Sequence, residues 1–168
     1  VGGLLDASAG EADGLTRVAR EKWSLFTASP AEAARVTTHA VMDVAERTGV
    51  RAALAVPDPV TTAAAPAEIR QDEAGVEFSV EGVRARAPMV GRHNAQNGAL
   101  ALAVAGAMGV PAAVAAEGLA HAEGPPMRLA VERLASGAGT ITLLNAAYNA
   151  HPDSVLAASE TLAAMDST

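Results

Sequence analysis

The chain has 168 residues and a formal net charge of −7 at pH 7, and 50% of its residues are hydrophobic although only 2% are aromatic. This length allows one large domain or one and a half small ones, with a core of alanine, valine and leucine. The acidic balance excludes a nucleic-acid surface, which would need clustered lysine and arginine. The absence of cysteine excludes disulfides and thiolate metal sites.

Neither a signal peptide nor a membrane span is predicted. Residues 1–5 have no basic flank and form only a short apolar run. No stretch approaches the roughly 20 apolar residues that a bilayer-spanning helix needs. We therefore expect a soluble, cytoplasmic protein.

The first third of the chain follows a β-α-β rhythm, which is typical of a parallel sheet with helices packed on it. Apolar runs and glycine stops predict strands and helices in alternation. The strands are expected at 1–5, 35–38 and 51–56, and the helices at 11–23 and 41–48. The next segment, 57–66, is rich in proline, threonine and alanine and predicts a loop.

The rest of the chain predicts a small antiparallel sheet followed by helices and a second strand pair. Glu81-Gly82 is a plausible hairpin turn between the second and third of these strands. Proline in a first turn and glycine after a last turn mark helix ends. The expected strands are 68–71, 76–80, 83–87, 129–134 and 140–144, and the expected helices are 95–108, 111–120 and 153–164.

Two asparagine-rich motifs carry a family resemblance. The first runs Gly91-Arg92-His93-Asn94-Ala95-Gln96-Asn97 and the second Tyr148-Asn149-Ala150-His151-Pro152-Asp153-Ser154. Each lies at an expected strand-to-helix junction, where backbone donors and side-chain amides gather. The pair resembles the Mur ligase family, in which G-x-H-N-x-x-N lies beside the adenine of ATP and Y-N-A-N-P-D-S opens the C-terminal domain.

The resemblance covers most of the chain, most clearly residues 88–164. It implies an α/β fold, namely a partial Mur-ligase-like central domain with a parallel sheet flanked by helices plus a small antiparallel sheet. It also implies two domains: 1–134 as part of the central ATP-binding-type domain, and 135–168 as the first β-α unit of the C-terminal domain.

The first motif implies a contact with adenine. By resemblance, Asn94 and Asn97 present amides to the adenine edge, which needs both a donor and an acceptor, and His93 lies beside them. The alternative is purely structural, with Asn94 as the N-cap of the following helix. Capping explains one asparagine but not two at this spacing.

Four residues further along the chain complete the expected nucleotide set. Arg128, in Pro126-Met127-Arg128, resembles the arginine of the family's P-G-R segment, which reaches the ATP phosphates; the alternative is a surface arginine at a strand edge. Asn145 and Tyr148 lie in Leu144-Asn145-Ala146-Ala147-Tyr148, which resembles the family's I-D-D-S-Y, and Asn149 comes directly after it. Both aspartates of that segment are replaced here, the second by Ala146.

Lys22 is the candidate catalytic residue. It lies in a segment that resembles the family's A-K-A-K-G-E-I-F, whose second lysine is carbamylated and helps to bind magnesium. A neutral amine is needed for carbamylation, so such a lysine must be partly desolvated. The alternative is a solvated lysine near a helix end. The same match places Ser8 where the family has a metal-binding histidine, and serine is a poor magnesium ligand, so no metal site is predicted.

The sequence therefore predicts a degenerate Mur-ligase-like protein. It contains no G-x-x-x-x-G-K-[ST] loop to hold a triphosphate, which favours a non-catalytic binding or partner subunit. One alternative is a piece of a split or truncated ATP-dependent amide ligase. Another is a small-ligand carrier that uses the nucleotide cleft of the family without ATP. ATP and magnesium are implied by resemblance alone. The expected partners are a second copy or another protein, bound through residues 1–5 or the last helix, and an adenine nucleotide.

Overall fold

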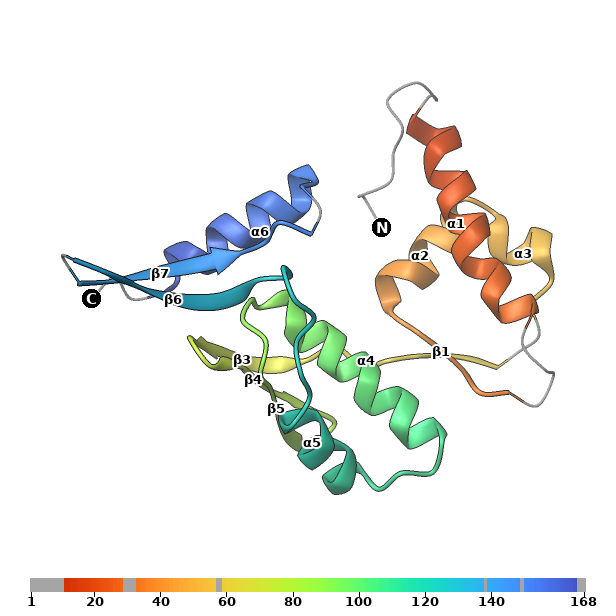
Figure 1. Cartoon of the computed structure of the whole chain (residues 1–168). Helices are drawn as coiled ribbons and strands as arrows, with labels where there is room; N and C mark the ends of the chain where they lie inside the picture. Colours follow the sequence, from red (N-terminus) through yellow and green to blue (C-terminus); the bar gives the residue numbers. More distant parts are fainter. Residues whose placement is uncertain (1–10, 29–32, 57–58, 138, 149, 166–168) are drawn as a thin grey trace. The chain divides into compact units, whose positions relative to one another are not determined.

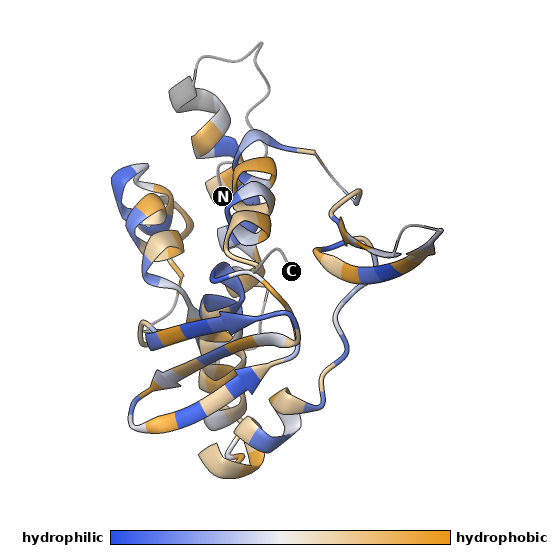
Figure 2. Cartoon of the chain, turned by 90° about the vertical axis from the view of Figure 1, so that its left-hand side faces the viewer, coloured by the Kyte–Doolittle hydropathy of each residue, from blue (hydrophilic) through white to orange (hydrophobic). Residues whose placement is uncertain are grey.

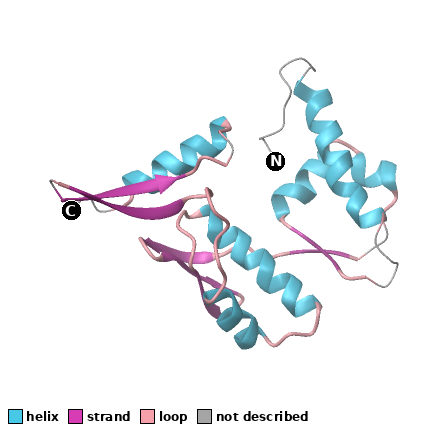
Figure 3. Ribbon diagram, in the orientation of Figure 1, coloured by secondary structure: helices cyan, strands magenta, loops and turns pink. Residues whose placement is uncertain are grey.

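The computed structural model describes residues 11–28, 33–56, 59–137, 139–148 and 150–165. It divides into two compact units, residues 1–64 and 65–168. The fold class is α/β, as expected, and the described residues form one small parallel sheet, two antiparallel sheets and flanking helices (Figure 3). The strand expected at 1–5 lies outside the described residues.

The first unit holds a two-stranded parallel sheet and three helices. Strand β1 (Arg35–Thr37) pairs in parallel with β2 (Val60–Thr62), and the helices α2 (His39–Arg47) and α3 (Val50–Leu54) connect them (Figure 1). Helix α1 (Glu11–Thr27) precedes β1 in the sequence. The parallel β-α-β arrangement is therefore confirmed.

Two expectations in this unit are wrong. Residues 51–56 were expected as a strand, but α3 occupies most of them, because Gly49 (φ 68°) turns the chain and Arg51 to Leu54 are strong helix formers. A short apolar run has no periodicity that separates a strand from a helix. The loop expected at 57–66 contains β2, whose Val60, Thr61 and Thr62 are β-branched and pair with β1.

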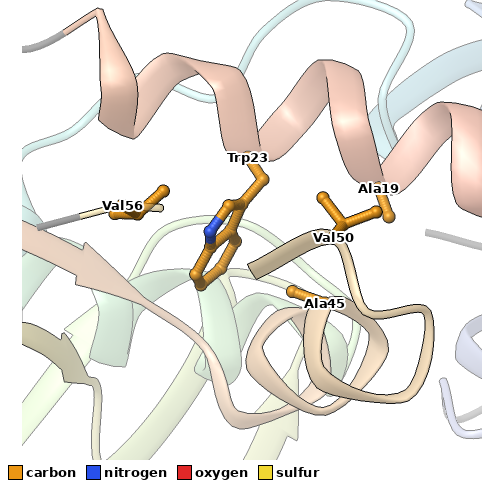
Figure 4. Packing of buried hydrophobic residues seen from close by; sticks show 5 residues of the cluster. All are labelled: Ala19, Trp23, Ala45, Val50 and Val56. Atoms are coloured by element: carbon orange, nitrogen blue, oxygen red, sulfur yellow. The ribbon is translucent and has the colours of Figure 1, made fainter. Parts of the chain in front are cut away.

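Trp23 forms the centre of the first unit's core. Its side chain is fully buried among Ala19, Ala45, Val50 and Val56, which come from α1, α2, α3 and the segment after α3 (Figure 4). Phe26 meets the indole edge-on, with ring centroids 4.9 Å apart. Although aromatic residues are rare in this chain, a buried tryptophan covers a large area, so Trp23 can organise the packing of three helices.

The second unit begins with a three-stranded antiparallel sheet. The strands are β3 (Ala67–Asp72), β4 (Gly75–Val80) and β5 (Val83–Ala87), in that spatial order. Glu81 (φ 49°) and Gly82 (φ 79°) form the β4–β5 turn with two positive φ angles, which matches the right-handed twist of a hairpin and confirms the expected turn. Hydrophilic and hydrophobic residues alternate along the strands (Figure 2).

Helix α4 (His93–Ala107) packs on this sheet through a glycine. Gly98 lies so close to Phe78 of β4 that a β-carbon there would be 2.6 Å from the ring. The close approach buries Phe78 together with Ala95 and Ala99 of the helix. Helix α5 (Ala112–Ala120) follows and lies beside β5.

The last elements are a hairpin and a helix. Strand β6 (Ala130–Ser136) pairs with β7 (Gly139–Asn145), and α6 (Pro152–Ala163) runs along β7 (Figure 1). The expected domain boundary after Leu134 falls within β6, and it stays a prediction. None of the helices in the described part of the chain is long and apolar enough to cross a membrane.

The composition of the core differs from the expectation in one respect. Among the described residues, the buried hydrophobic side chains are alanines, valines, Trp23 and Phe78, with no leucine. Several leucines instead lie exposed on the hairpin and on α6, among them Leu134, Leu143 and Leu156. Composition alone does not show which apolar residues the tertiary structure covers.

Candidate functional site

A tight turn at Gly91 begins the first asparagine-rich motif. Gly91 has φ 103°, which favours glycine, and its N–H donates to the side-chain oxygen of Gln71, 3.1 Å away. The side-chain amide of Asn94 donates to the carbonyl of Val90 across a distance of 2.7 Å. These two hydrogen bonds hold the turn against β3 and fix the start of α4.

The two asparagines of this motif have different roles. Asn94 is only 7% exposed, and its Oδ1 accepts a hydrogen bond of 2.9 Å from Nδ2 of Asn97. Because its Nδ2 and its Oδ1 both form hydrogen bonds within the protein, the Asn94 side chain positions the side chain of Asn97. Asn97 is exposed, and its own Oδ1 accepts no hydrogen bond from the residues that the structure describes. Asn97 is therefore the amide that can meet a ligand.

The capping alternative for Asn94 does not hold. Helix α4 begins at His93, and its N-cap is Arg92, whose side chain makes no capping hydrogen bond. Arg92 instead donates to the carbonyl of Ile69, 3.0 Å away. Asn94 thus lies inside the first helical turn, and its side chain bonds backward to Val90 because the Gly91 turn brings that carbonyl within reach.

His93 covers the same turn with its ring. A β-carbon on Gly91 would lie 2.6 Å from Cε1 and 3.0 Å from Nδ1 of His93, so the ring rests directly on the glycine. The residue as a whole remains exposed. Partial burial of the ring lowers the pKa of His93 below its ordinary value, since it penalises the charged form. Burial therefore favours the neutral form of the imidazole.

A strained segment of backbone adjoins the Gly91 turn. The Cδ1 atom of Leu129 would lie 3.1 Å from a β-carbon on Gly91. Leu129 (φ 58°) and Met127 (φ 59°) both adopt the left-handed conformation that non-glycine residues avoid. They flank Arg128, so the backbone is strained on both sides of this candidate site residue. The strain was not predicted from the sequence. Met127, at the glycine position of the family's P-G-R segment, was a signal for it.

Arg128 and Tyr148 meet in a cation–π contact. The guanidinium carbon of Arg128 lies 4.1 Å from the centroid of the Tyr148 ring. The N–H of Tyr148 also donates to the carbonyl of Met127 at 3.1 Å, which ties the two segments together. Because Tyr148 is 59% exposed, the stacked pair is accessible from solvent.

Asn145 is engaged within the hairpin. Its Nδ2 donates to Oε1 of Glu132, 2.8 Å away, and its Oδ1 accepts from the N–H of Ala147 at 3.2 Å. These bonds form a local turn at the end of β7. Asn145 therefore has less capacity for a ligand than its sequence position suggests. Asn149 and Ser8 lie outside the described residues.

Lys22 is exposed on α1, in the first unit. The other sequence-predicted residues that the structure describes all lie in the second unit. Within the described ranges, no group of three or more histidine, aspartate and glutamate side chains could hold a metal ion. The described side chains therefore do not fit a magnesium site.

The second unit thus brings several polar and planar groups to one region. The Gly91 turn carries His93 and Asn97, Leu129 touches that turn, and the stack of Arg128 on Tyr148 adjoins Leu129. A neutral imidazole and an amide can bond to a heterocycle, and a guanidinium can bind a phosphate. The chemistry of this region suits recognition of a planar base with an anionic group.

Comparisons with known proteins show a similarity to Mur ligases. No family model matches the chain. The chain is similar to the UDP-N-acetylmuramoyl-tripeptide–D-alanyl-D-alanine ligase of Bacillus subtilis, with 33% identity over 93 residues, which cover 54% of this chain and 20% of that protein.

Solved structures show the same fold. MurF from Acinetobacter baumannii has a TM-score of 0.70 at 21% identity, over 98% of this chain and 36% of that one. The UDP-N-acetylmuramoylalanyl-D-glutamyl-2,6-diaminopimelate–D-alanyl-D-alanyl ligase of Acinetobacter baumannii has a TM-score of 0.66 at 21% identity, over 92% of this chain and 34% of that one. The chain therefore resembles a part of a Mur ligase, and it spans about a third or less of the length of these proteins.

Proposed function

We propose that this Mur-ligase-like chain is a non-catalytic module that binds the adenine side of a nucleotide. The observation that carries the proposal is that the two asparagines have different roles, one structural and one exposed to solvent. Asn94 is engaged at both ends and holds Asn97, which stays exposed next to His93. Helix capping alone would not require the exposed side-chain amide of Asn97.

The absence of catalysis by this chain is supported by its site residues. Ala146 stands where the family has an aspartate that serves the nucleotide. Asn145, at the other replaced aspartate, bonds to Glu132 and Ala147. Phosphoryl transfer depends on placed cations and backbone donors around the phosphates, and the described residues do not supply that set.

Calorimetry with adenosine, AMP and ATP tests the binding proposal. Asn97→Ala should weaken binding by about 1–3 kcal/mol, because a hydrogen-bonding group of the ligand loses its partner. Gln96→Ala is the matched control, since it removes the neighbouring amide from the same helix, and it should leave the affinity unchanged. Absence of adenosine binding, or equal effects of the two substitutions, would contradict the proposal.

A second function is favoured by the similarity to a whole ligase. The identity of 33% over 93 residues suits a piece of an ATP-dependent amide ligase that is active only with the remainder of the enzyme. The two functions differ in turnover once the remainder of a Mur ligase is supplied as a separate chain. We expect no ADP release above background with magnesium, muramyl tripeptide and D-alanyl-D-alanine. Turnover that disappears in Lys22→Ala would instead favour the ligase.

A further inference from the structure

We infer that Gln71 is a positioning residue for the proposed adenine contact, and that it acts on Asn97 through the Gly91 turn without touching the ligand. This role of Gln71 rests on the proposed function, because it concerns the affinity of the same site. Gln71 lies on β3, opposite Val76 of β4 in the ladder. Its half-buried carboxamide reaches two segments that lie far along the chain, the Gly91 turn and helix α6.

The Gly91 turn depends on the acceptor end of this carboxamide. The N–H of Gly91 donates to Oε1 of Gln71 across 3.1 Å. Gly91 is buried and precedes the N-cap of α4, so its N–H is outside the hydrogen-bond ladder of that helix. A buried N–H that loses its acceptor destabilises the conformation that buries it. The side chain of Gln71 therefore stabilises the turn in the conformation that the structure shows.

A second contact between the turn and β3 contributes less. The guanidinium of Arg92 donates to the carbonyl of Ile69 at 3.0 Å, but the Arg92 side chain is exposed. Water can replace a hydrogen-bond partner at an exposed site, whereas a buried donor loses its partner outright. Of the two contacts, the one with Gln71 is therefore the one on which the turn depends.

Helix α6 fixes the direction in which the carboxamide of Gln71 faces. Its Nε2 lies 3.5 Å from the carbonyl oxygen of Thr161, a long contact, and Thr161 is only 4% exposed. A carboxamide has an acceptor at one end and donors at the other. When the donor end faces the carbonyl of Thr161, the acceptor end faces the N–H of Gly91. The two neighbours therefore favour the same orientation of Gln71.

The Gly91 turn transmits this position to the candidate site. It brings the carbonyl of Val90 within 2.7 Å of Nδ2 of Asn94, and Oδ1 of Asn94 holds Nδ2 of Asn97 at 2.9 Å. The ring of His93 rests on the same glycine. A turn released from β3 would no longer hold the Asn97 amide beside the His93 ring. A ligand that bonds to both groups would then bind more weakly, because binding would have to order the turn.

Calorimetry of the full chain with adenosine tests the inference through two substitutions of Gln71. Gln71→Leu removes both hydrogen-bonding ends, so it should weaken adenosine binding about tenfold. Gln71→Glu keeps an acceptor for the N–H of Gly91 but opposes the carbonyl of Thr161, so the affinity should stay within about threefold of the wild type. Arg70→Leu is the control, because Arg70 is the neighbouring, exposed residue of β3, and it should leave the affinity unchanged. Equal weakening by the leucine and glutamate variants, or no weakening by Gln71→Leu, would overturn the inference.

Nuclear magnetic resonance of the free protein separates this inference from the proposed function. In Gln71→Leu the amide proton of Gly91 should exchange with solvent about tenfold faster than in the wild type, and the side-chain amide signals of Asn94 and Asn97 should shift. In Gln71→Glu these signals should stay close to those of the wild type. Absence of adenosine binding by the wild type would overturn the proposed function, while these spectra still decide whether Gln71 positions Asn97. Unchanged Gly91 and Asn97 signals in Gln71→Leu would overturn the positioning role itself.

Discussion

Arg128 lies over the face of Tyr148, with its guanidinium carbon 4.1 Å from the ring centroid. The two residues are 20 positions apart in the sequence, and the hydrogen bond from the N–H of Tyr148 to the carbonyl of Met127 brings them together. The contact joins the segment before β6 to the segment after β7. Leu129, the residue after Arg128, lies against the Gly91 turn, so the contact also keeps the guanidinium of Arg128 near that turn.

This pair should show a measurable coupling in a double-mutant cycle. With Arg128→Ala and Tyr148→Leu, chemical denaturation should give a coupling energy of about 0.5–1 kcal/mol, the range for an exposed cation–π contact. Tyr148→Phe keeps the ring and should keep the coupling with Arg128. Strictly additive single effects would show that the contact contributes nothing to stability.

Met127→Gly should stabilise the protein. Met127 has φ 59° and is 43% exposed, so glycine removes backbone strain at little cost in packing. The gain should be about 0.5–1 kcal/mol, after the greater entropy of glycine in the unfolded chain is subtracted. Met127→Ala is the control, because it retains the β-carbon and should bring no gain. Urea unfolding measures both, and equal midpoints would contradict the expectation.

Gly91→Ala should have the opposite effect. Alanine would have to adopt φ 103°, and its β-carbon would meet His93 and Leu129. We expect a loss of about 1–3 kcal/mol in the free energy of unfolding. Gly106→Ala provides a contrast, since Gly106 is within α4 and a β-carbon added there would meet open space. That change should stabilise the helix by up to about 1 kcal/mol.

His151 is the N-cap of α6, at the position where the family motif has asparagine. Oγ of Ser154 accepts a hydrogen bond from the N–H of His151 at 3.0 Å and donates one to the carbonyl of His151 at 2.8 Å. Ser154→Ala should therefore cost about 1 kcal/mol and reduce the helical signal, whereas Ser154→Thr should retain stability. Circular dichroism with urea unfolding measures both variants. No loss in the alanine variant would exclude a capping role.

Asp72 should contribute stability that depends on pH. The hydrogen bond from Arg86, 2.7 Å long, is the main cause that lowers the pKa of Asp72 below its ordinary value, and the N–H of Ala74 adds a second bond. A carboxyl group whose folded pKa is lowered stabilises the fold above its unfolded pKa, and this contribution is lost as the pH falls through the folded value.

Asp72→Asn should thus be less stable than the wild type at neutral pH and equally stable in strong acid. Since the Asp72 side chain is 58% exposed, solvent screening limits the difference to about 1 kcal/mol or less. In an Arg86→Met background the effect of Asp72→Asn should shrink. A difference between Asp72→Asn and the wild type that persists unchanged into strong acid would contradict this account. Urea midpoints measured across the acid range provide the test.

Elements with strong local signals could be predicted from the sequence. The hairpin at Glu81-Gly82 needs positive φ angles that its residues supply, and helix α5 follows a proline that fixes its start. Helix α3 and strand β2 could not be predicted, because segments of five and three residues are too short to show a periodicity. In β2, a parallel neighbour 25 residues away decides the state, as in Arg35↔Val60.

The sequence by itself determined the α/β class, the second unit's order of strands and helices, and the motifs that resemble a Mur ligase. Those features depend on periodicity, turn residues and residue identity, which are local. Only the tertiary structure decided that Asn94 supports Asn97 and that Met127 and Leu129 are strained around Arg128. Each of these depends on which groups meet across the fold, and local propensity does not contain that information.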